Sequence, residues 1–124
     1  MKPKSLSVHH IALKVADLVR IAAFYAETLG LPEIKRQKDE KGNERSVWFD
    51  CGGTILMLEE GKPVATENLI ALAIQLFERS LWKRRLEKQG VKIESESPYS
   101  FYLRDPEGNR LALSHYPDKK TGLS

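Results

Sequence analysis

The six residues from His10 to Val15 read HIALKV, and the six from Leu69 to Ile74 read LIALAI. In the first stretch apolar residues occupy every second position, which is typical of a β-strand buried on one face. The second stretch matches the first position by position. Each is followed by a segment of helical periodicity that ends at a glycine, Gly30 or Gly90. This repeat, with a period near half the chain, predicts a duplicated structural unit.

The first half of the chain has the predicted order βαβββ. Asp17 is the expected N-cap of the helix, because its carboxylate can accept backbone N–H groups of the first turn. Gly30 and Pro32 end the helix. Strands are predicted over 34–37, 45–50 and 54–58, separated by a charged turn and by a Gly-Gly turn. The apolar residues at helical spacing are Leu18, Ile21, Ala22, Phe24, Tyr25 and Leu29.

The second half predicts the same order. Strands are expected over 91–95, 100–104 and 109–115, and the last two are joined by a turn that contains Pro106 and Gly108. The apolar residues of its helix are Leu76, Phe77, Leu81, Trp82 and Leu86. We predict an α+β fold of two βαβββ units, 7–60 and 67–117, within a single domain that spans 1–124. A polar stretch, 59–68, reads as the linker between them.

Composition limits the classes of function. A chain of 124 residues is long enough to bury one core. Its single cysteine, Cys51, excludes an intrachain disulfide and favours the reducing cytoplasm. No apolar run approaches the roughly 18 residues of a membrane span, so no membrane partner is expected. The net charge is +3, but the basic cluster at 83–85 is not interleaved with aromatic residues, so nucleic acid is not an expected partner.

Three motifs in this order resemble the vicinal oxygen chelate superfamily, which includes glyoxalases, bleomycin resistance proteins and extradiol dioxygenases. They are residues 10–18 at the first strand, Phe24-Tyr25 with Leu29-Gly30-Leu31 at the helix end, and 105–113 near the chain end. The resemblance covers nearly the whole chain. It implies strands that curl around a cavity, helices on the outer face, and a homodimer that covers exposed strand edges.

The resemblance also implies where a metal site would lie. Metalloenzymes of that superfamily place ligands on the first and last strand of each half, which correspond to His10, Met57, Leu69 and Ala112 in this chain. Only His10 can bind a hard or borderline cation, whereas zinc, nickel or iron sites need about three or more N, O or S donors. We therefore expect no metal and no other cofactor, and the family's metal chemistry does not follow from the fold.

The same strand face is predicted to bind a ligand. Met57, Leu69 and the alanines would form an apolar floor, with Trp48 and Tyr102 as aromatic walls. The alternative is that these side chains simply fill the core. The predicted ligand-binding residues are His10, Ala12, Lys14, Trp48, Met57, Leu69, Ala71, Tyr102, Arg110 and Ala112.

The charged members of this set have two interpretations each. Lys14 and Arg110 either contact an anionic group or extend into solvent. His10 is the only candidate catalytic residue, as a general base, or it is a half-buried histidine bonded to backbone. His9 is expected on the opposite face of the strand. We also expect the helix faces with Phe24, Leu29, Leu81 and Leu86 to pack opposite His10 and Ala112.

Two functions of different class follow. The preferred hypothesis is a metal-independent binding protein of the bleomycin-resistance type that holds a small aromatic or amphipathic organic ligand. The basic charge of the chain favours a neutral or anionic ligand. The alternative is an enzyme, a glyoxalase-like lyase or isomerase or a dioxygenase-like protein, with an atypical site that uses His10.

Overall fold

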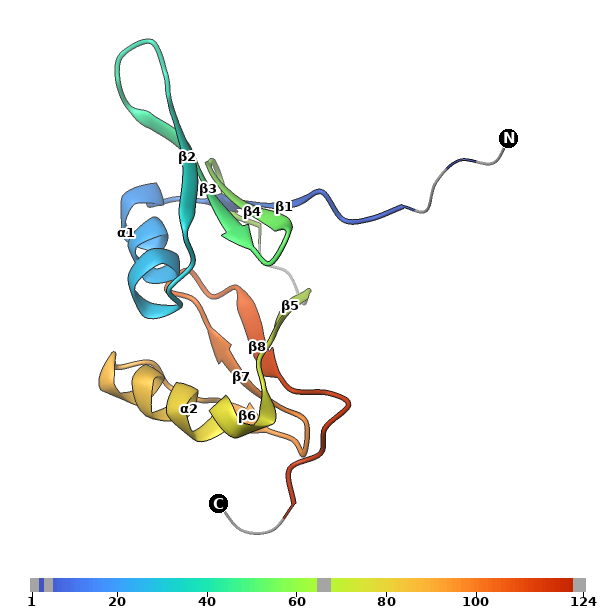
Figure 1. The fold of residues 1–124 in the computed structure, drawn as a ribbon. Helices are drawn as coiled ribbons and strands as arrows, with labels where there is room; N and C mark the ends of the chain where they lie inside the picture. The colour runs from blue at the N-terminus through green and yellow to red at the C-terminus, as the bar shows by residue number, and fades with distance from the viewer. Residues whose placement is uncertain (1–2, 4–5, 65–67, 122–124) are drawn as a thin grey trace. The chain divides into compact units, whose positions relative to one another are not determined.

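The computed structural model describes residues 3, 6–64 and 68–121 (Figure 1). The chain divides into two compact units, residues 1–64 and 65–124, and each is described by itself. Each unit contains a four-stranded sheet of mixed direction and one main helical segment, which confirms the predicted α+β class. The predicted linker over 59–68 lies partly outside the described residues. Within the described ranges, no helix is long and apolar enough to span a membrane.

The first unit has the predicted order of elements. They are β1 (His10–Val15), α1 (Leu18–Ala23), the π-helical turn η1 (Phe24–Thr28), β2 (Glu33–Lys38), β3 (Glu44–Cys51) and β4 (Thr54–Glu60). The strand order in the sheet is β1-β4-β3-β2, in which β1 is parallel to β4 and the other pairs are antiparallel. The crossover from β1 through the helix therefore returns the chain to the far edge of the sheet.

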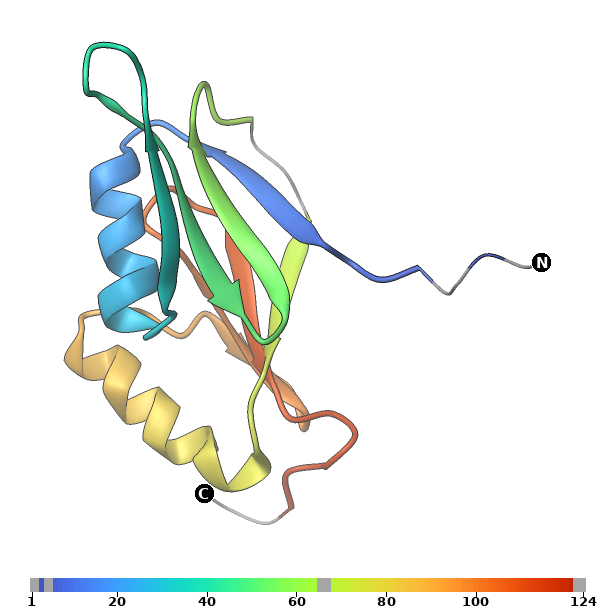
Figure 2. The same cartoon turned by 45° about the horizontal axis from the view of Figure 1, so that its top comes forward.

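The helix of the first unit covers one face of its sheet (Figure 2). Asp17 caps it as predicted, since Oδ1 accepts the backbone N–H of Arg20 at 3.2 Å. Tyr25 is fully buried and its ring centroid lies 6.3 Å from that of Phe49 on β3. Phe49 belongs to the buried face of the sheet, and alternation along β1 leaves His10 on the opposite face. The predicted packing of this helix is confirmed.

The second unit repeats the arrangement with shorter strands. Its elements are β5 (Leu69–Ala73), the 3₁₀ turn η2 (Leu76–Glu78), α2 (Arg79–Lys88), β6 (Ser95–Glu96), β7 (Ser100–Arg104) and β8 (Arg110–Ser114). The order is β5-β8-β7-β6, again with a parallel outer pair. The strand predicted over 91–95 is wrong in extent, because only Ser95 and Glu96 pair with β7.

The helix of the second unit presents a different face to the sheet than the sequence predicted. Leu86 is fully buried, and the Arg79 guanidinium lies 5.7 Å from the ring centroid of Phe101 on β7. Leu81 is 55% exposed, so the prediction that it packs on the sheet is wrong. At 3.6 residues per turn, Leu81 lies about 140° around the helix from Leu86, whereas Arg79 lies within about 20° of it. Leu81 and Leu86 therefore cannot face the same sheet.

Candidate ligand-binding faces

The open face of the first sheet carries a row of side chains that runs across all four strands. Strand register aligns Lys35, Trp48, Met57 and Ala12 in this row. Trp48 and Met57 are half-buried and Ala12 is exposed. The Trp48 indole donates to Ser46 Oγ at 3.1 Å, and Lys35 Nζ lies 5.0 Å from its ring centroid. The row is thus an accessible apolar strip with one oriented aromatic ring.

A polar row borders this strip. Lys14 and Glu59 are partners in the β1–β4 register and form an ion pair, Nζ to Oε2, of 3.3 Å. The Lys14 stem lies over Gly61, where an added Cβ would come within 2.8 Å of Lys14 Cδ. Both charged side chains are substantially exposed, and such pairs contribute only about 0–1 kcal/mol. The pair therefore adds little to the stability of the sheet.

His10 lies at the start of the same face. Its Nδ1 is 3.0 Å from Nδ1 of His9, and the two rings meet edge to face with centroids 5.3 Å apart. The prediction that the two histidines point to opposite faces is wrong. β1 begins at His10, so His9 precedes the strand and the alternation of a regular strand does not extend to it. One imidazole of the pair donates a proton and the other accepts it.

The open face of the second sheet carries the equivalent positions. Tyr102, Ala112 and Ala71 are aligned by register across β7, β8 and β5. Tyr102 is half-buried and Ala71 is exposed, but Ala112 is 1% exposed and offers no accessible surface. Leu69, at the start of β5, is 40% exposed. This face is also apolar, and its aromatic ring stands where Trp48 stands in the first unit.

Arg110 shares this second face with Ala112, as expected from alternation. It is half-buried and opposite Arg104 on the neighbouring strand. Arg104 is engaged locally, since Nε donates to Glu94 Oε1 at 3.1 Å and Nη1 donates to the Gly108 carbonyl at 2.9 Å. Arg104 therefore supports the turn before β8, and Arg110 lies beside it on the same face.

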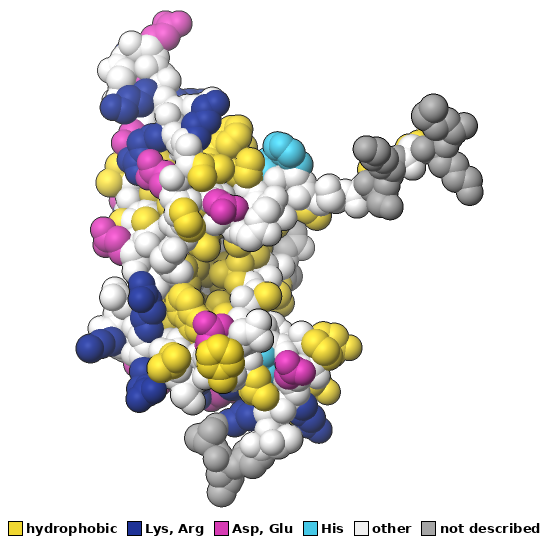
Figure 3. All heavy atoms as spheres, viewed as in Figure 1, with side chains coloured by type: hydrophobic (Ala, Val, Ile, Leu, Met, Phe, Trp, Pro, Cys, Tyr) yellow, Lys and Arg dark blue, Asp and Glu magenta, His cyan; other side chains and the backbone are white. Residues whose placement is uncertain are grey.

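The two registers establish that the units are equivalent residue by residue. In the first unit His10 pairs with Ile55 and Trp48 with Met57. In the second unit Leu69 pairs with Arg110, and Tyr102 with Ala112. His10 thus corresponds to Leu69, and Met57 to Ala112. In the space-filling view, hydrophobic side chains and a histidine are exposed over the strands of the first unit (Figure 3).

The family model of the Glyoxalase/Bleomycin resistance protein/Dioxygenase superfamily matches residues 7–113. The chain belongs to this superfamily. No curated protein matches the chain in sequence. The family match confirms the resemblance to the vicinal oxygen chelate superfamily that the motifs indicated. The order of strands and helices confirms the paired βαβββ fold.

Solved structures of superfamily members share the fold. A lactoylglutathione lyase from Agrobacterium tumefaciens has a TM-score of 0.74 and 24% identity over 93% of this chain and 96% of its own. The E126Q mutant of the fosfomycin resistance protein FosX from Listeria monocytogenes, complexed with Mn(II) and 1S,2S-dihydroxypropylphosphonic acid, has a TM-score of 0.77 and 26% identity over 90% and 93%. A possible glyoxalase from Bacillus cereus has a TM-score of 0.73 and 24% identity over 89% and 99%.

The metal chemistry found in parts of the superfamily does not fit the residues of this member. The four positions that correspond to metal ligands carry His10, Met57, Leu69 and Ala112, of which only the imidazole is a good donor. In the described part of the chain, no group of three or more His, Cys, Asp or Glu side chains could hold a metal ion. The residue types at these four positions therefore do not fit a zinc, nickel or iron site, which needs about three or more N, O or S donors.

A buried polar cluster in the second unit was not predicted. Arg79 is 4% exposed; its Nη1 is 2.8 Å from His115 Nε2, and its Nη2 donates to Glu96 Oε1 at 3.0 Å. Hydrogen bonds from Lys83 and Arg79 hold the pKa of the Glu96 carboxyl below its ordinary value of 4.5. The sequence contained one indication of this cluster. Arg79 is a charged residue at a helix position on the same side as Leu86. The cluster lies on the Phe101 side of the sheet, away from the ligand face.

Proposed function

We propose that this superfamily member binds a small aromatic or amphipathic organic ligand without a metal ion, on the open faces of its two sheets. One observation carries the proposal. The positions that correspond to metal ligands in the superfamily are occupied by His10, Met57, Leu69 and Ala112, and the register places Trp48 beside Met57 and Tyr102 beside Ala112. A row of this composition favours apolar and stacking contacts over coordination.

Coordination chemistry argues for metal independence. A dication that leaves water must recover its hydration energy from charged and neutral donors. His10 offers one imidazole, already in contact with His9. Methionine is a weak, soft ligand, and leucine and alanine are not ligands at all.

The charges on the two faces favour a neutral or anionic ligand. Lys35 and Lys14 lie on the first face, and Arg110 lies on the second. Lys35 already contacts the Trp48 ring, which would make a second cation at that ring unfavourable. A carboxylate can exchange with Glu59 at Lys14.

We also propose that the chain is a homodimer. Both sheets are open, so β1 and β5 each have one edge without a strand partner among the described residues. Such edges are usually covered by pairing or association. Light scattering at micromolar concentration should give twice the chain mass, and a monomer would contradict the proposal.

The test of binding uses Trp48 as the reporter. In a Trp82→Phe background Trp48 is the remaining tryptophan, because the chain has two. Titration with 2-naphthoate and with its neutral amide should shift the Trp48 indole N–H resonance for both probes, since apolar contact dominates. Met57→Lys should weaken both, because it places a charge in the apolar row, whereas Lys41→Gln on the β2–β3 turn should not.

The test of metal independence is titration with zinc and nickel. The wild-type chain and His10→Ala should both show only the weak binding typical of surface histidines. Tight, stoichiometric binding that His10→Ala loses would contradict the proposal. Native mass spectrometry of the purified protein would show any organic ligand that is retained.

A second candidate function is metal-independent proton transfer at His10, as in a lyase or isomerase. The contact with His9 favours it, because a neighbouring imidazole can exchange a proton with a general base. Burial, and then the nearby Asp50, raise the pKa of the Cys51 thiol, which disfavours the nucleophilic thiolate form. Activity that is lost in both His9→Ala and His10→Ala, with zinc absent, would support this function.

A further inference from the structure

Ser46 on β3 is a buried polar residue on the open face of the first sheet. It lies two residues before Trp48, so both side chains project from the same face of the strand. Ser46 is 3% exposed. Its Oγ accepts the indole N–H of Trp48 at 3.1 Å and donates to Oε1 of Gln37 on β2 at 3.0 Å. The hydroxyl thus uses its single proton on one neighbour and accepts from the other.

These two hydrogen bonds fix the rotation of the indole. A tryptophan side chain rotates about two bonds, and the preference about the second is broad. The bond to Ser46 anchors the N–H edge of the ring, and Gln37 restrains the Ser46 hydroxyl in turn. Lys35 Nζ lies 5.0 Å from the ring centroid, but on a flexible stem. The ring therefore has one orientation before a ligand arrives.

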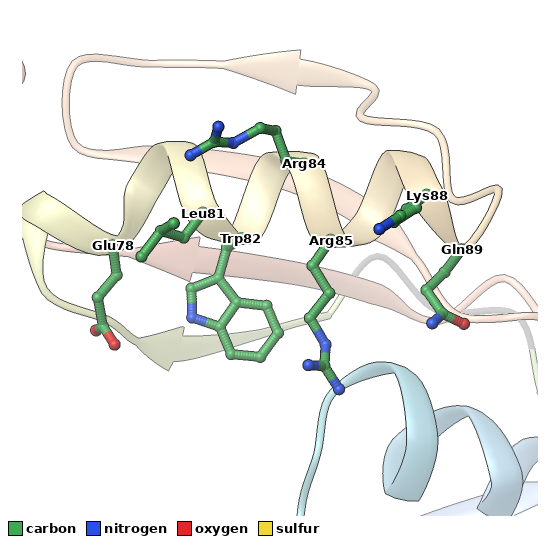
Figure 4. Close-up of a pocket in the computed structure, with 7 residues that line it drawn as sticks. All are labelled: Glu78, Leu81, Trp82, Arg84, Arg85, Lys88 and Gln89. Atoms are coloured by element: carbon green, nitrogen blue, oxygen red, sulfur yellow. The ribbon is translucent and has the colours of Figure 1, made fainter.

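Trp82 shows that a cation beside an indole does not bring such a bond with it. It lines the open pocket along α2, and Figure 4 shows its indole extending from the helix beside Arg85. The Arg85 guanidinium lies 5.6 Å from the ring centroid, an arrangement similar to that of Lys35 and Trp48. Within the described ranges, the Trp82 N–H donates to no other residue. The bond to Ser46 is what distinguishes Trp48.

The second sheet shows that the fold does not require this bond. Register makes Ser100 the equivalent of Ser46, two residues before Tyr102. Ser100 Oγ donates to Ser114 Oγ at 2.8 Å and not to the aromatic ring. The Tyr102 side chain forms no hydrogen bond with any residue that the structure describes. The hydrogen bond from the aromatic ring is thus particular to the first sheet.

We propose that Ser46 is a positioning residue that holds the Trp48 ring in the orientation that the ligand of the first sheet contacts. This inference rests on the ligand binding proposed above. A ring that is already fixed loses little conformational entropy when a flat ligand packs on it, which is worth about two- to tenfold in affinity. The bond also occupies the single polar group of the indole, so Trp48 offers the ligand apolar and π surface but no donor.

The first measurement is made on ligand-free protein in a Trp82→Phe background, in which Trp48 gives the remaining indole N–H resonance. Ser46→Ala should move this resonance, speed the exchange of the N–H with water, and lower its ¹⁵N heteronuclear NOE because the ring gains motion. Ser100→Ala removes a buried serine hydroxyl at the equivalent position of the second sheet. It should leave the Trp48 signal unchanged.

A pair of variants at Gln37 keeps the test decisive if Ser46→Ala does not fold. Gln37 is exposed, so its substitution leaves the core intact. Gln37→Met removes the acceptor of the Ser46 hydroxyl and should change the Trp48 resonance and NOE in the same direction as Ser46→Ala. Gln37→Glu retains an acceptor oxygen and should keep the wild-type values.

The second measurement is the affinity for 2-naphthamide, followed at the methyl resonance of Met57, which is the register neighbour of Trp48. Ser46→Ala should weaken binding about two- to tenfold. Trp48→Phe has no indole N–H, so the addition of Ser46→Ala to it should cause no further loss. This double-mutant cycle isolates the part of the effect that depends on the bond between the two side chains. Ser100→Ala should leave the affinity unchanged.

Two results would overturn the proposal. One is an unchanged Trp48 resonance and NOE in both Ser46→Ala and Gln37→Met, whether or not the probe binds. The other is an equal loss of affinity when Ser46→Ala is made in the wild type and in Trp48→Phe, since the loss would then not depend on the ring orientation. Failure of 2-naphthamide to bind the wild type would count against the proposed function of the face, whereas the ligand-free spectra test Ser46 separately.

Discussion

Nη1 of Arg79 lies 2.8 Å from Nε2 of His115, and both side chains are almost completely buried. A guanidinium has only donors, so Nε2 of the imidazole must be the acceptor. The proton of a neutral ring is then on Nδ1, which lies 2.6 Å from the Asp118 carbonyl oxygen. This contact connects α2 with the segment after β8.

We expect His115 to be the Nδ1–H tautomer in solution. ¹⁵N chemical shifts of the imidazole at neutral pH should show a protonated Nδ1 and an unprotonated Nε2. His9 and His10, which are exposed, serve as internal comparisons. A protonated Nε2 would show that the contact with Arg79 is not formed.

Arg79→Met should destabilise the protein by about 2–4 kcal/mol, since it leaves buried acceptors without a donor. Arg79 donates to Glu96 and to the Ser97 carbonyl in addition to His115. Urea unfolding is the measurement. Arg84→Met, an exposed change on the same helix, should stay within about 0.5 kcal/mol. Equal losses of unfolding free energy in the two variants would mean that the buried cluster contributes nothing to stability.

The stability that Glu96 contributes should disappear at acid pH. Its pKa is lowered in the folded state, so this contribution is complete above the ordinary value of 4.5 and is lost as the pH falls through the folded-state pKa. The difference in unfolding free energy between wild type and Glu96→Gln should therefore shrink below about pH 4.5. A difference that is constant down to pH 2 would contradict the ion pairs with Lys83 and Arg79.

Truncation of two leucines on α2 tests which side of the helix faces the sheet. Leu86→Ala should cost about 2–4 kcal/mol, because the side chain is fully buried and leaves a cavity. Leu81→Ala should cost less than about 1 kcal/mol, because that side chain is largely exposed. Thermal or urea unfolding gives both values. A larger loss of stability in Leu81→Ala than in Leu86→Ala would mean that Leu81 packs on the sheet, as the sequence predicted.

Local patterns were sufficient to predict much of the fold and of the candidate faces. Alternation along 10–15 placed His10, Ala12 and Lys14 on one side of the first sheet, and the strand registers agree. The Asp17 cap needs only neighbouring residues. The turn after Asp105 is equally local, since Oδ1 accepts the N–H groups two and four residues later at 2.9 Å. Such features follow from short-range geometry and so can be read from the sequence.

Only the tertiary structure decided how α2 is oriented. Its sequence has apolar residues on two sides, Leu81 on one and Leu86 on the other, so helical spacing alone admits either side as the inward one. The choice depends on partners distant along the chain: Phe101 beneath Arg79, and His115 at its guanidinium. Once Arg79 is held there, by a contact that spans 36 residues, helical periodicity turns Leu81 outward.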